Sequence, residues 1–338
     1  FQQIVARQAN KTLLISDEVH NAGAKEFRGS VNEDVPFRLG LSATPERRYD
    51  DSGNLFIKGY FGETVYEFDL KDAIKAGVLT RYRYYPVLVN LVEKEQEIYL
   101  DLTARIGRLF AQGTGNEEDD GPSENLKRLL IQRARLIANA KAKLPALVKL
   151  LNEREEPLKS GLVYCGDGSV ESASSQETMR QVSEVCRLLG EELGLRVRQY
   201  TAEEPPEERS VILSDFEQGY LDAVVAIRCL DEGVDLPVAE TGFLLASSSN
   251  PRQYVQRRGR LLRRAPGKNF SFIYDLIIVP PDLGGSESDA MFNVERRLFR
   301  KELARICEFC ETADNGETAL DTLLPLRTRY NLLAGVKA

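Results

Sequence analysis

Short apolar segments alternate with helical segments between residues 159 and 285, and this alternation restricts the fold more than any other feature. Five segments are rich in β-branched and aromatic residues and have the length of strands: 161–166, 195–202, 221–230, 240–247 and 270–279. Most of the stretches between them have helical patterns. Alternation of this kind predicts a parallel, doubly wound sheet with helices on both faces. In such sheets, ligands bind at the carboxyl ends of the strands.

The length and composition of the chain limit the class of protein further. A chain of 338 residues predicts two domains, and a hydrophobic fraction of 42% supplies enough apolar side chains for their cores. The formal net charge of −7 argues against a surface covered with phosphate-binding charge, but it allows a local basic groove. Five cysteines, an odd number, favour a reducing location, either cytoplasmic or nucleoid-associated. No apolar run reaches the ~20 residues that span a bilayer, so we expect no membrane partner.

The remaining segments predict short strands near the start and long helices in the middle of the chain. Residues 13–16 indicate a buried strand, and residues 37–45 indicate a second short strand that ends at a small polar turn. Residues 93–113 have apolar side chains at helical spacing. Residues 124–154 predict either one long helix or two helices broken near Pro145.

Two adjacent carboxylates, Asp17 and Glu18, follow the first predicted strand and precede His20, the single histidine of the chain. Neighbouring like charges repel each other, and in a dry site each raises the pKa of the other. A metal ion is the simplest positive partner. One carboxylate can hold Mg²⁺ while the other orients an attacking water, as phosphoryl transfer requires. The alternative is an exposed acidic pair in a turn.

Small polar residues follow two other predicted strands. Ser42 and Thr44 lie at the end of the second strand, where their hydroxyls either relay between two sites or only cap a turn. Gly233 permits a close backbone approach, and Asp235 is then placed to bind a ribose hydroxyl. The alternative for this second pair is an ordinary Gly-Asp turn.

The basic segment from Pro251 to Lys268 is the most informative part of the sequence, because it contains many arginines and no acidic residue. On a helix over 251–264, Gln256, Arg260 and Arg263 fall on one side, opposite an apolar side that packs on the sheet. This row favours contact with triphosphate oxygens, since guanidinium groups stabilise charge that develops in phosphoryl transfer. The alternative is a solvated basic face.

Four of these segments together resemble a known family. In chain order they read DEVH (17–20), SAT (42–44), DEGVDLP (231–237) and QRRGRLLR (256–263). The set is similar to motifs II, III, V and VI of the DEAD/DEAH-type helicases and translocases of superfamily 2. The surrounding residues most resemble the XPB/Rad25-like and type I/III restriction-motor branch. The resemblance covers about residues 11–279.

The resemblance implies a role for each motif residue. Asp17 is expected to hold Mg²⁺, Glu18 to activate water, and His20 to link the ATP site to Gln256 or to the SAT motif. Ser42 and Thr44 are expected to couple ATP to nucleic acid. Further expectations concern the later part of the chain: nucleotide contacts by Gly233 and Asp235, arginine fingers at Arg260 and Arg263, and a nucleic-acid contact at Thr201.

The resemblance also implies an α/β architecture of two RecA-like lobes with parallel sheets. We expect the remainder of an incomplete first lobe at 1–90, a helical insert at 91–156, the second lobe at 157–285 and a helical extension at 286–338. ATP and Mg²⁺ are the expected cofactors, and DNA is the expected nucleic acid. The implied activity is ATP hydrolysis coupled to movement on DNA.

The phosphate-binding motif I, G-x-x-x-x-G-K-[ST], does not occur in these 338 residues. We therefore expect the chain to be the C-terminal portion of a longer protein. One alternative is a nucleic-acid-binding or regulatory module without hydrolysis. Another is a motor subunit that serves a nuclease in a restriction or defence system.

Residues 1–338 on their own should show weak or undetectable ATP binding and no turnover, because the backbone cradle and lysine of motif I are missing from them. Nucleotide titration and a steady-state phosphate-release assay on this chain would test the expectation. Robust ATPase activity from these residues alone would contradict it.

Overall fold

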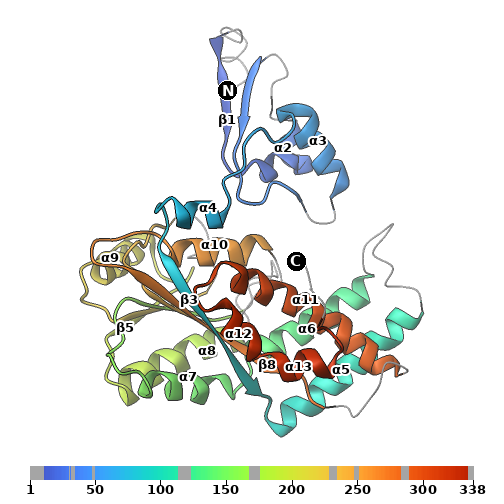
Figure 1. Cartoon of the computed structure of the whole chain (residues 1–338), viewed down its shortest axis with the longest axis vertical. Helices are drawn as coiled ribbons and strands as arrows, with labels where there is room; N and C mark the ends of the chain where they lie inside the picture. Colours follow the sequence, from blue (N-terminus) through green and yellow to red (C-terminus); the bar gives the residue numbers. More distant parts are fainter. Residues whose placement is uncertain are drawn as a thin grey trace. The chain divides into compact units, whose positions relative to one another are not determined.

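The computed structural model describes residues 11–29, 31, 35–47, 50–112, 123–166, 176–227, 234–246, 251–282 and 289–333. The chain divides into two compact units, Phe1–Asp69 and Leu70–Ala338 (Figure 1). Each unit is built around a parallel sheet, which confirms the predicted α/β class.

The first unit contains a two-stranded sheet and a small group of helices. Strands β1 (Leu13–Ser16) and β2 (Phe37–Gly40) pair in parallel. A 3-10 turn, η2 (Val19–Gly23), and helix α2 (Lys25–Arg28) follow β1, and α3 (Asp51–Phe61) follows β2. Val19, Ala22 and Ile57 form the apolar contact between η2 and α3.

One side of this small sheet is apolar and exposed, so the prediction of a buried strand at residues 13–16 is wrong for the observed unit. The register pairs Leu13 with Phe37 and Ile15 with Leu39. These side chains share one side of the sheet and are between 38% and 59% exposed. Parallel sheets are normally covered on both faces. The uncovered apolar side therefore agrees with an incomplete first lobe.

The second unit is a six-stranded parallel sheet in the order β3-β8-β7-β4-β6-β5. Its strands are β3 (Arg81–Asn90), β4 (Gly161–Tyr164), β5 (Val197–Tyr200), β6 (Ala223–Ala226), β7 (Thr241–Leu244) and β8 (Phe270–Val279). The central strands β4, β6 and β7 are buried along their whole length, as apolar runs in a parallel sheet should be.

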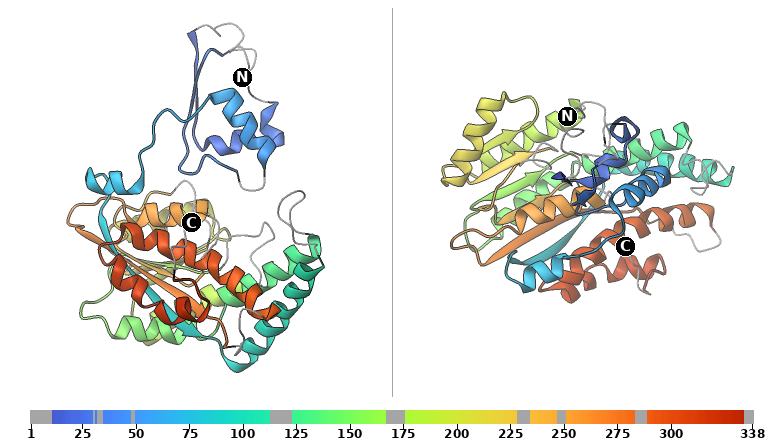
Figure 2. Two further views of the ribbon diagram at one scale, coloured as in Figure 1. Left: turned by 45° about the vertical axis from the view of Figure 1, so that its right-hand side comes forward. Right: turned by 90° about the horizontal axis from the view of Figure 1, so that it is seen from above.

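Helices cover both faces of this sheet (Figures 1 and 2). One apolar core holds side chains of α9 (Pro206–Glu217), α10 (Pro251–Leu261) and α11 (Ala290–Thr312). The other holds side chains of α7 (Lys143–Asn152) and α8 (Gln176–Arg187). The predicted alternation of strands and helices is thus reproduced in space. A short helix, α4 (Leu70–Lys75), precedes β3.

The helical insert consists of α5 (Glu93–Ala111) and α6 (Glu124–Ala138). The predicted alternative of two helices broken near Pro145 is the one observed, since α6 ends at Ala138 and α7 (Lys143–Asn152) begins at Lys143. Pro145 itself lies in the first turn of α7, where proline is tolerated. A buried network attaches the insert to α11. Arg133 Nη2 lies 2.8 Å from Glu295 Oε1, which also accepts the hydroxyl proton of Tyr99 at 2.5 Å.

The observed division of the chain differs from the expected boundary at residue 90. Strand β3 pairs with β8 along all of Arg81–Asn90, so this segment belongs to the sheet of the second unit. Tyr99 of the insert contributes to a core of the same unit. The difference arises because a strand's pairing partner, here almost 190 residues away, is not visible in the local sequence pattern.

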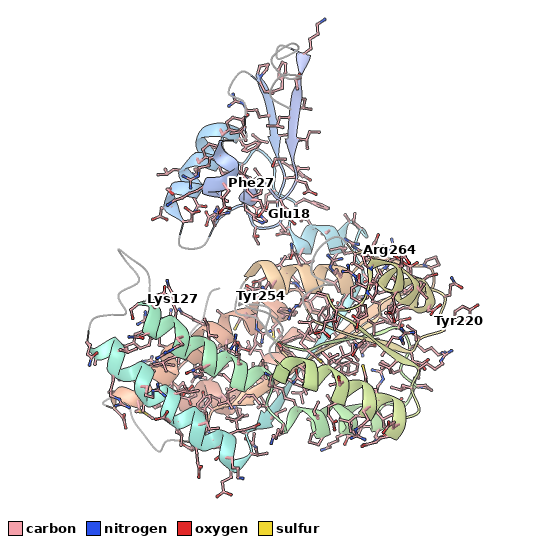
Figure 3. All side chains as sticks on the ribbon, turned by 180° about the vertical axis from the view of Figure 1, so that it is seen from behind. Glu18, Phe27, Lys127, Tyr220, Tyr254 and Arg264 are labelled. Carbon is pink, nitrogen blue, oxygen red and sulfur yellow. The ribbon has the colours of Figure 1, made fainter. Side chains whose placement is uncertain are left out.

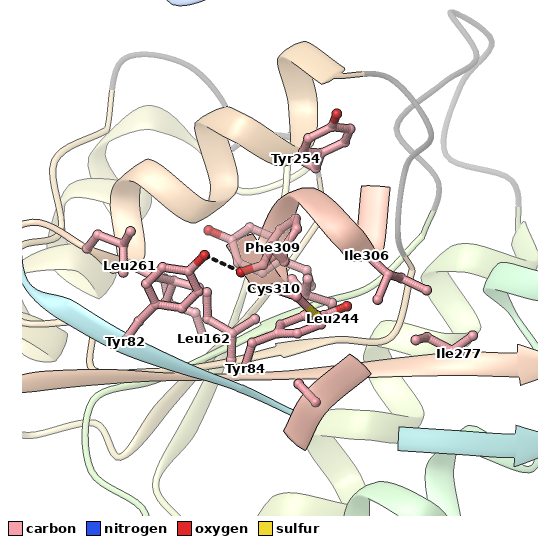
Figure 4. Packing of buried hydrophobic residues seen from close by; sticks show 14 of the residues in the cluster. Tyr82, Tyr84, Leu162, Leu244, Tyr254, Leu261, Ile277, Ile306, Phe309 and Cys310 are labelled. Atoms are coloured by element: carbon pink, nitrogen blue, oxygen red, sulfur yellow. Dashed lines mark hydrogen bonds between the residues drawn. The ribbon is translucent and has the colours of Figure 1, made fainter. Parts of the chain in front are cut away.

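The C-terminal helices α11, α12 (Gly316–Asp321) and α13 (Leu324–Arg329) form the predicted helical extension and seal the edge strand β3. The side-chain amide of Asn315 accepts from Tyr84 N at 2.8 Å and donates to Tyr84 O at 2.9 Å. Pro86, two residues further along, has no N–H to leave unpaired on that edge. The Tyr82 hydroxyl donates to the Phe309 carbonyl at 2.6 Å (Figure 4). The two bonds of Asn315 to the main chain of Tyr84 thus take the place that a neighbouring strand would have at this position.

Replacing Asn315 with alanine should lower the free energy of unfolding by about 1–3 kcal/mol, because two main-chain groups of Tyr84 lose their partner. Urea unfolding followed by circular dichroism would measure the loss. Asn125→Ala, at an exposed position of α6, is the matched control and should leave stability unchanged. Equal stabilities of the two variants would contradict the proposed seal.

Candidate functional site

Glu18 sits in a left-handed backbone conformation where β1 ends, with φ 48° and ψ 53°. Such a conformation costs a non-glycine residue about 1–2 kcal/mol and is found most often where function requires a particular geometry. Two main-chain hydrogen bonds hold the turn: Leu41 N donates to Ser16 O, and Val19 N donates to Leu41 O, both at 2.8 Å. The ends of the two strands therefore fix the position of the acidic turn.

Three predicted residues meet beside this turn. His20, which is 2% exposed, places Nδ1 at 3.1 Å from Ser42 Oγ and at 3.2 Å from Glu18 Oε2. The Ser42 hydroxyl also lies 3.5 Å from Glu18 Oε2. Parallel neighbouring strands end at the same edge of a sheet, which is why residues 24 positions apart in the chain come together. His20 thus contacts Ser42 of the SAT motif, which is one of the two partners expected for it.

Asp17 and Thr44 occupy the margin of the Glu18–His20–Ser42 cluster. Asp17 is exposed, and its Oδ1 accepts from Glu18 N at 2.9 Å. Thr44 N donates to Ser42 Oγ at 3.1 Å, whereas the buried Thr44 hydroxyl has no hydrogen-bond partner within the described structure. Among the described residues, no group of three His, Cys, Asp or Glu side chains forms a metal cage. A single exposed carboxylate still fits Mg²⁺, which is usually held by one or two carboxylates and phosphate oxygens.

A second layer of residues, which the sequence analysis missed, supports His20. Arg47 donates from Nη1 to His20 O and from Nε to Asp50 Oδ2, each at 2.7 Å. Asp50 also caps α3 by accepting from Gly53 N at 2.8 Å. These contacts from Arg47 and from the Gly53 N–H lower the pKa of Asp50 to about 2. The available signals were the charged residues directly after the SAT motif and an aspartate just before a helix.

In the second unit, Asp235 and Arg263 form an ion pair between Oδ1 and Nη1. Their side chains remain 70% and 41% exposed. An exposed pair of this kind contributes about 0–1 kcal/mol, so a ligand can replace either partner at little cost. Two predicted residues thus lie together, while Gly233 falls outside the described residues.

Arg263 is not part of the helix predicted over 251–264, because α10 ends at Leu261. Arg263 instead forms an isolated antiparallel bridge with Leu79. The predicted Gln256–Arg260–Arg263 row is therefore wrong as a single helical face. Gln256 is half-buried, and Arg260 is only 7% exposed. Figure 3 labels Tyr254 within α10 and Arg264 beyond its end.

Two other arginines of α10 are buried and hold the helix in place. The alternative of a solvated basic face is therefore wrong for these two residues. Arg257 donates to Ala246 O at 2.8 Å and lies over the ring of Tyr164. Arg258 donates to Glu308 Oε1 at 2.7 Å and lies over the ring of Phe309. Both side chains are at most 4% exposed. Charge in this segment therefore stabilises the packing of α10 on its neighbours.

Thr201, the predicted nucleic-acid contact, is 1% exposed. Its hydroxyl accepts from Glu203 N at 3.1 Å, and its main-chain N–H donates to the Glu204 carboxylate. The side chain thus serves the turn that precedes α9. Its burial leaves little surface for a ligand in this conformation.

The fold of the second unit and its motif residues can be compared with known protein families. Residues 142–265 match the helicase conserved C-terminal domain, so this part of the second unit is similar to a helicase lobe. The predicted resemblance to superfamily 2 helicases is confirmed. No helix in the described part of the chain is long and apolar enough to cross a membrane.

Particular relatives place the similarity within the XPB/Rad25 branch. The chain is 26% identical over 271 residues to the DNA 3'-5' translocase XPB2 of Sulfurisphaera tokodaii, covering 75% of this chain and 56% of that protein. It is also 26% identical over 254 residues to a candidate DNA 3'-5' helicase Rad25 of Haloarcula marismortui, covering 75% of this chain and 33% of that protein. The chain thus spans about half or less of the length of these relatives.

A solved structure shares the fold. A fragment from Vibrio vulnificus YJ016, described as an HsdR subunit of a type I restriction enzyme, superposes with a TM-score of 0.50 at 21% identity. The superposition covers 82% of this chain and 46% of that one. At this level of identity the similarity concerns the fold.

The pKa of Asp50 predicts a pH-dependent stability of the first unit. Because the folded pKa of about 2 lies below the ordinary value of 3.8, the carboxylate stabilises the fold fully above about pH 4 and loses this effect as the pH falls toward 2. Denaturant unfolding at pH values from 2.5 to 6 should show that Asp50→Asn is destabilised most at pH 6. The exposed neighbour provides a control, Asp51→Asn, which should show no such trend. The same pH trend in both variants would disprove the assignment.

Proposed function

We propose that the protein containing this chain is an ATP-dependent helicase or translocase that moves on DNA. The observation that carries this proposal is the cluster in which Glu18 and His20 of one motif contact Ser42 of the next. The names of the relatives, a DNA translocase and a candidate DNA helicase, support DNA as the nucleic acid. The roles of individual residues in this reaction are also proposed.

The first unit supplies the groups that act on water and metal. Asp17 would hold Mg²⁺, which neutralises phosphate charge when bound. Glu18 would accept a hydrogen bond from the attacking water and orient it. Its backbone is held by the turn between β1 and β2, so the carboxylate is positioned before the nucleotide arrives.

The contact between His20 and Ser42 offers a path from hydrolysis to nucleic acid. When Glu18 changes its hydrogen bonds during hydrolysis, the shared contacts of His20 and Ser42 must change with them. Thr44 N donates to Ser42 Oγ, so a shift of the Ser42 hydroxyl would also disturb the main chain of Thr44. We propose that this segment couples the two events.

The second unit supplies charge stabilisation and nucleotide recognition. Arg263, which is partly exposed beyond the end of α10, would stabilise the charge that develops on the transferred phosphoryl group. Asp235 would bind a ribose hydroxyl. Their ion pair is exposed, so a nucleotide can replace it at little cost.

Glu18→Gln in the complete protein should retain ATP binding while hydrolysis falls by about 10²-fold or more, because an amide cannot take the general-base role. Nucleotide affinity and steady-state ATPase, both with saturating DNA, would separate the two effects. Glu26→Gln, at an exposed position of α2, is the control. A turnover number near that of the wild type would reduce Glu18 to a turn residue.

Arg263→Ala should lower kcat by about 10³-fold, the scale of a lost arginine finger, with DNA affinity in the absence of nucleotide little changed. Arg264→Ala is the matched control, since this neighbour is exposed and donates from Nη1 to the Gly77 carbonyl, away from Asp235. Arg258 is unsuitable, because breaking its buried pair with Glu308 should destabilise the protein by about 3–5 kcal/mol. Equal losses of kcat in Arg263→Ala and Arg264→Ala would contradict a specific role of Arg263 and would indicate a general effect of basic charge.

The class of nucleic acid can be tested by measuring the ATPase rate of the complete protein in the presence of single-stranded DNA, duplex DNA or RNA. Stimulation by DNA above RNA supports the proposal. Nucleic-acid binding without any hydrolysis favours the regulatory-module alternative, and activity that depends on a nuclease partner favours the defence-system alternative.

A further inference from the structure

Lys268 is buried between α10 and β8, and its ammonium group is surrounded by main-chain oxygens. The side chain is 8% exposed. Nζ donates to four carbonyls: Pro237 O at 3.1 Å, Ala239 O at 2.5 Å, Leu261 O at 2.7 Å and Arg263 O at 2.8 Å. An ammonium group has three hydrogens, so at least one of them is shared between two oxygens.

The four carbonyls belong to two separate segments that each carry a proposed nucleotide-contacting residue. Pro237 and Ala239 closely follow Asp235. Leu261 ends α10, and Arg263 is the proposed arginine finger itself. One buried cation therefore joins the main chain beside Asp235 to the main chain of Arg263.

Other residues cap the same helix end without making this connection in the contacts observed. The Ser271 hydroxyl donates to Leu261 O at 2.6 Å. Thr80 donates to Leu262 O from its main-chain N at 2.8 Å and from Oγ1 at 2.9 Å. These bonds satisfy the open carbonyls at the end of the helix, which is their general function. Lys268 does this as well, but it also reaches the second segment.

A buried ammonium group is a poor choice if packing alone is required. Burial lowers the pKa of Lys268 to about 8, which reflects the cost of removing the charge from water. An apolar side chain of similar volume often stabilises a core equally well or better. The convergence on four carbonyls gives the charge a different use, which is to hold two segments at a fixed separation.

We propose that Lys268 is a positioning residue for the ATPase reaction, which sets the placement of Arg263 relative to Asp235. It does not itself contact the nucleotide, because its ammonium group is enclosed by the two segments. The inference rests on the proposed function of Arg263, but the link between the segments can be tested without activity.

The first test is hydrogen exchange of the 338-residue chain. Lys268→Met removes the charge and keeps a long flexible side chain, so main-chain exchange should rise at least tenfold in both 235–240 and 261–264. Ser271→Ala removes a bond to the same helix end and should raise exchange at 261–264 only. A change confined to one segment in Lys268→Met, or no change, overturns the proposal. If Lys268→Met does not fold, Lys268→Arg is used, because its planar head cannot converge on four carbonyls in the same way.

The second test measures ATPase of the complete protein in a double-mutant cycle. Lys268→Met should lower kcat by about 10–10²-fold with little change in KM, which is the scale expected when a catalytic group is misplaced. In an Arg263→Ala background the same change should have almost no further effect on kcat, because Lys268 acts through Arg263. Independent, multiplying losses would overturn the proposal and indicate a general structural role.

The two tests separate failure of this inference from failure of the proposed function. If Arg263→Ala leaves kcat unchanged, the function proposed for Arg263 is wrong. The positioning role of Lys268 is then wrong as well, even if hydrogen exchange rises in both segments. If Arg263→Ala lowers kcat and Lys268→Met does not, only the present inference is wrong.

Discussion

The pairing of β3 with β8 is the interaction on which the second unit depends. It runs in parallel register over Arg81–Asn90 and Phe270–Val279. Because β3 is fixed there, Thr80 just before it can cap the end of α10, and Tyr84 can donate to the buried Asp275 of β8 at 2.6 Å. The outer edge of β3 has no neighbouring strand among the described residues. Asn315 pairs with the main chain of Tyr84 there, and Pro86 has no N–H that would need a partner. The insert, the C-terminal helices and the end of α10 are therefore organised around one long strand pair.

Positive charge in the α10 region is divided between structure and proposed chemistry. Arg257, Arg258 and Lys268 are buried, and each of them donates to a main-chain carbonyl or to Glu308. Arg263 differs because the helix has ended before it and its side chain reaches the exposed Asp235. The hydrogen bonds of these buried charges hold the helix end in place, and the proposed arginine finger needs a fixed support if it is to stabilise a transition state without reorganisation.

The first unit follows the same principle at smaller scale. Glu18 and Ser42 meet because two parallel strands end side by side, and His20 fills the space between them. Arg47 and Asp50 fix the main chain of His20 from behind. Arg47 and Asp50 thus support the proposed catalytic carboxylate of Glu18 and the proposed coupling hydroxyl of Ser42 through His20.

The sequence by itself determined the α/β class, the strands and helices of the second unit, and the residues of the Glu18–His20–Ser42 cluster. These features depend on local periodicity, on turn residues and on the rule that parallel strands end at one edge. Only the tertiary structure decided that β3 joins the second sheet, that α10 ends before Arg263, and that Arg258 and Thr201 are buried. Strand pairing and burial depend on partners far away in the chain, such as β8 for β3 and Glu308 for Arg258. A local pattern carries no information about which distant residue will satisfy a given strand edge or charge.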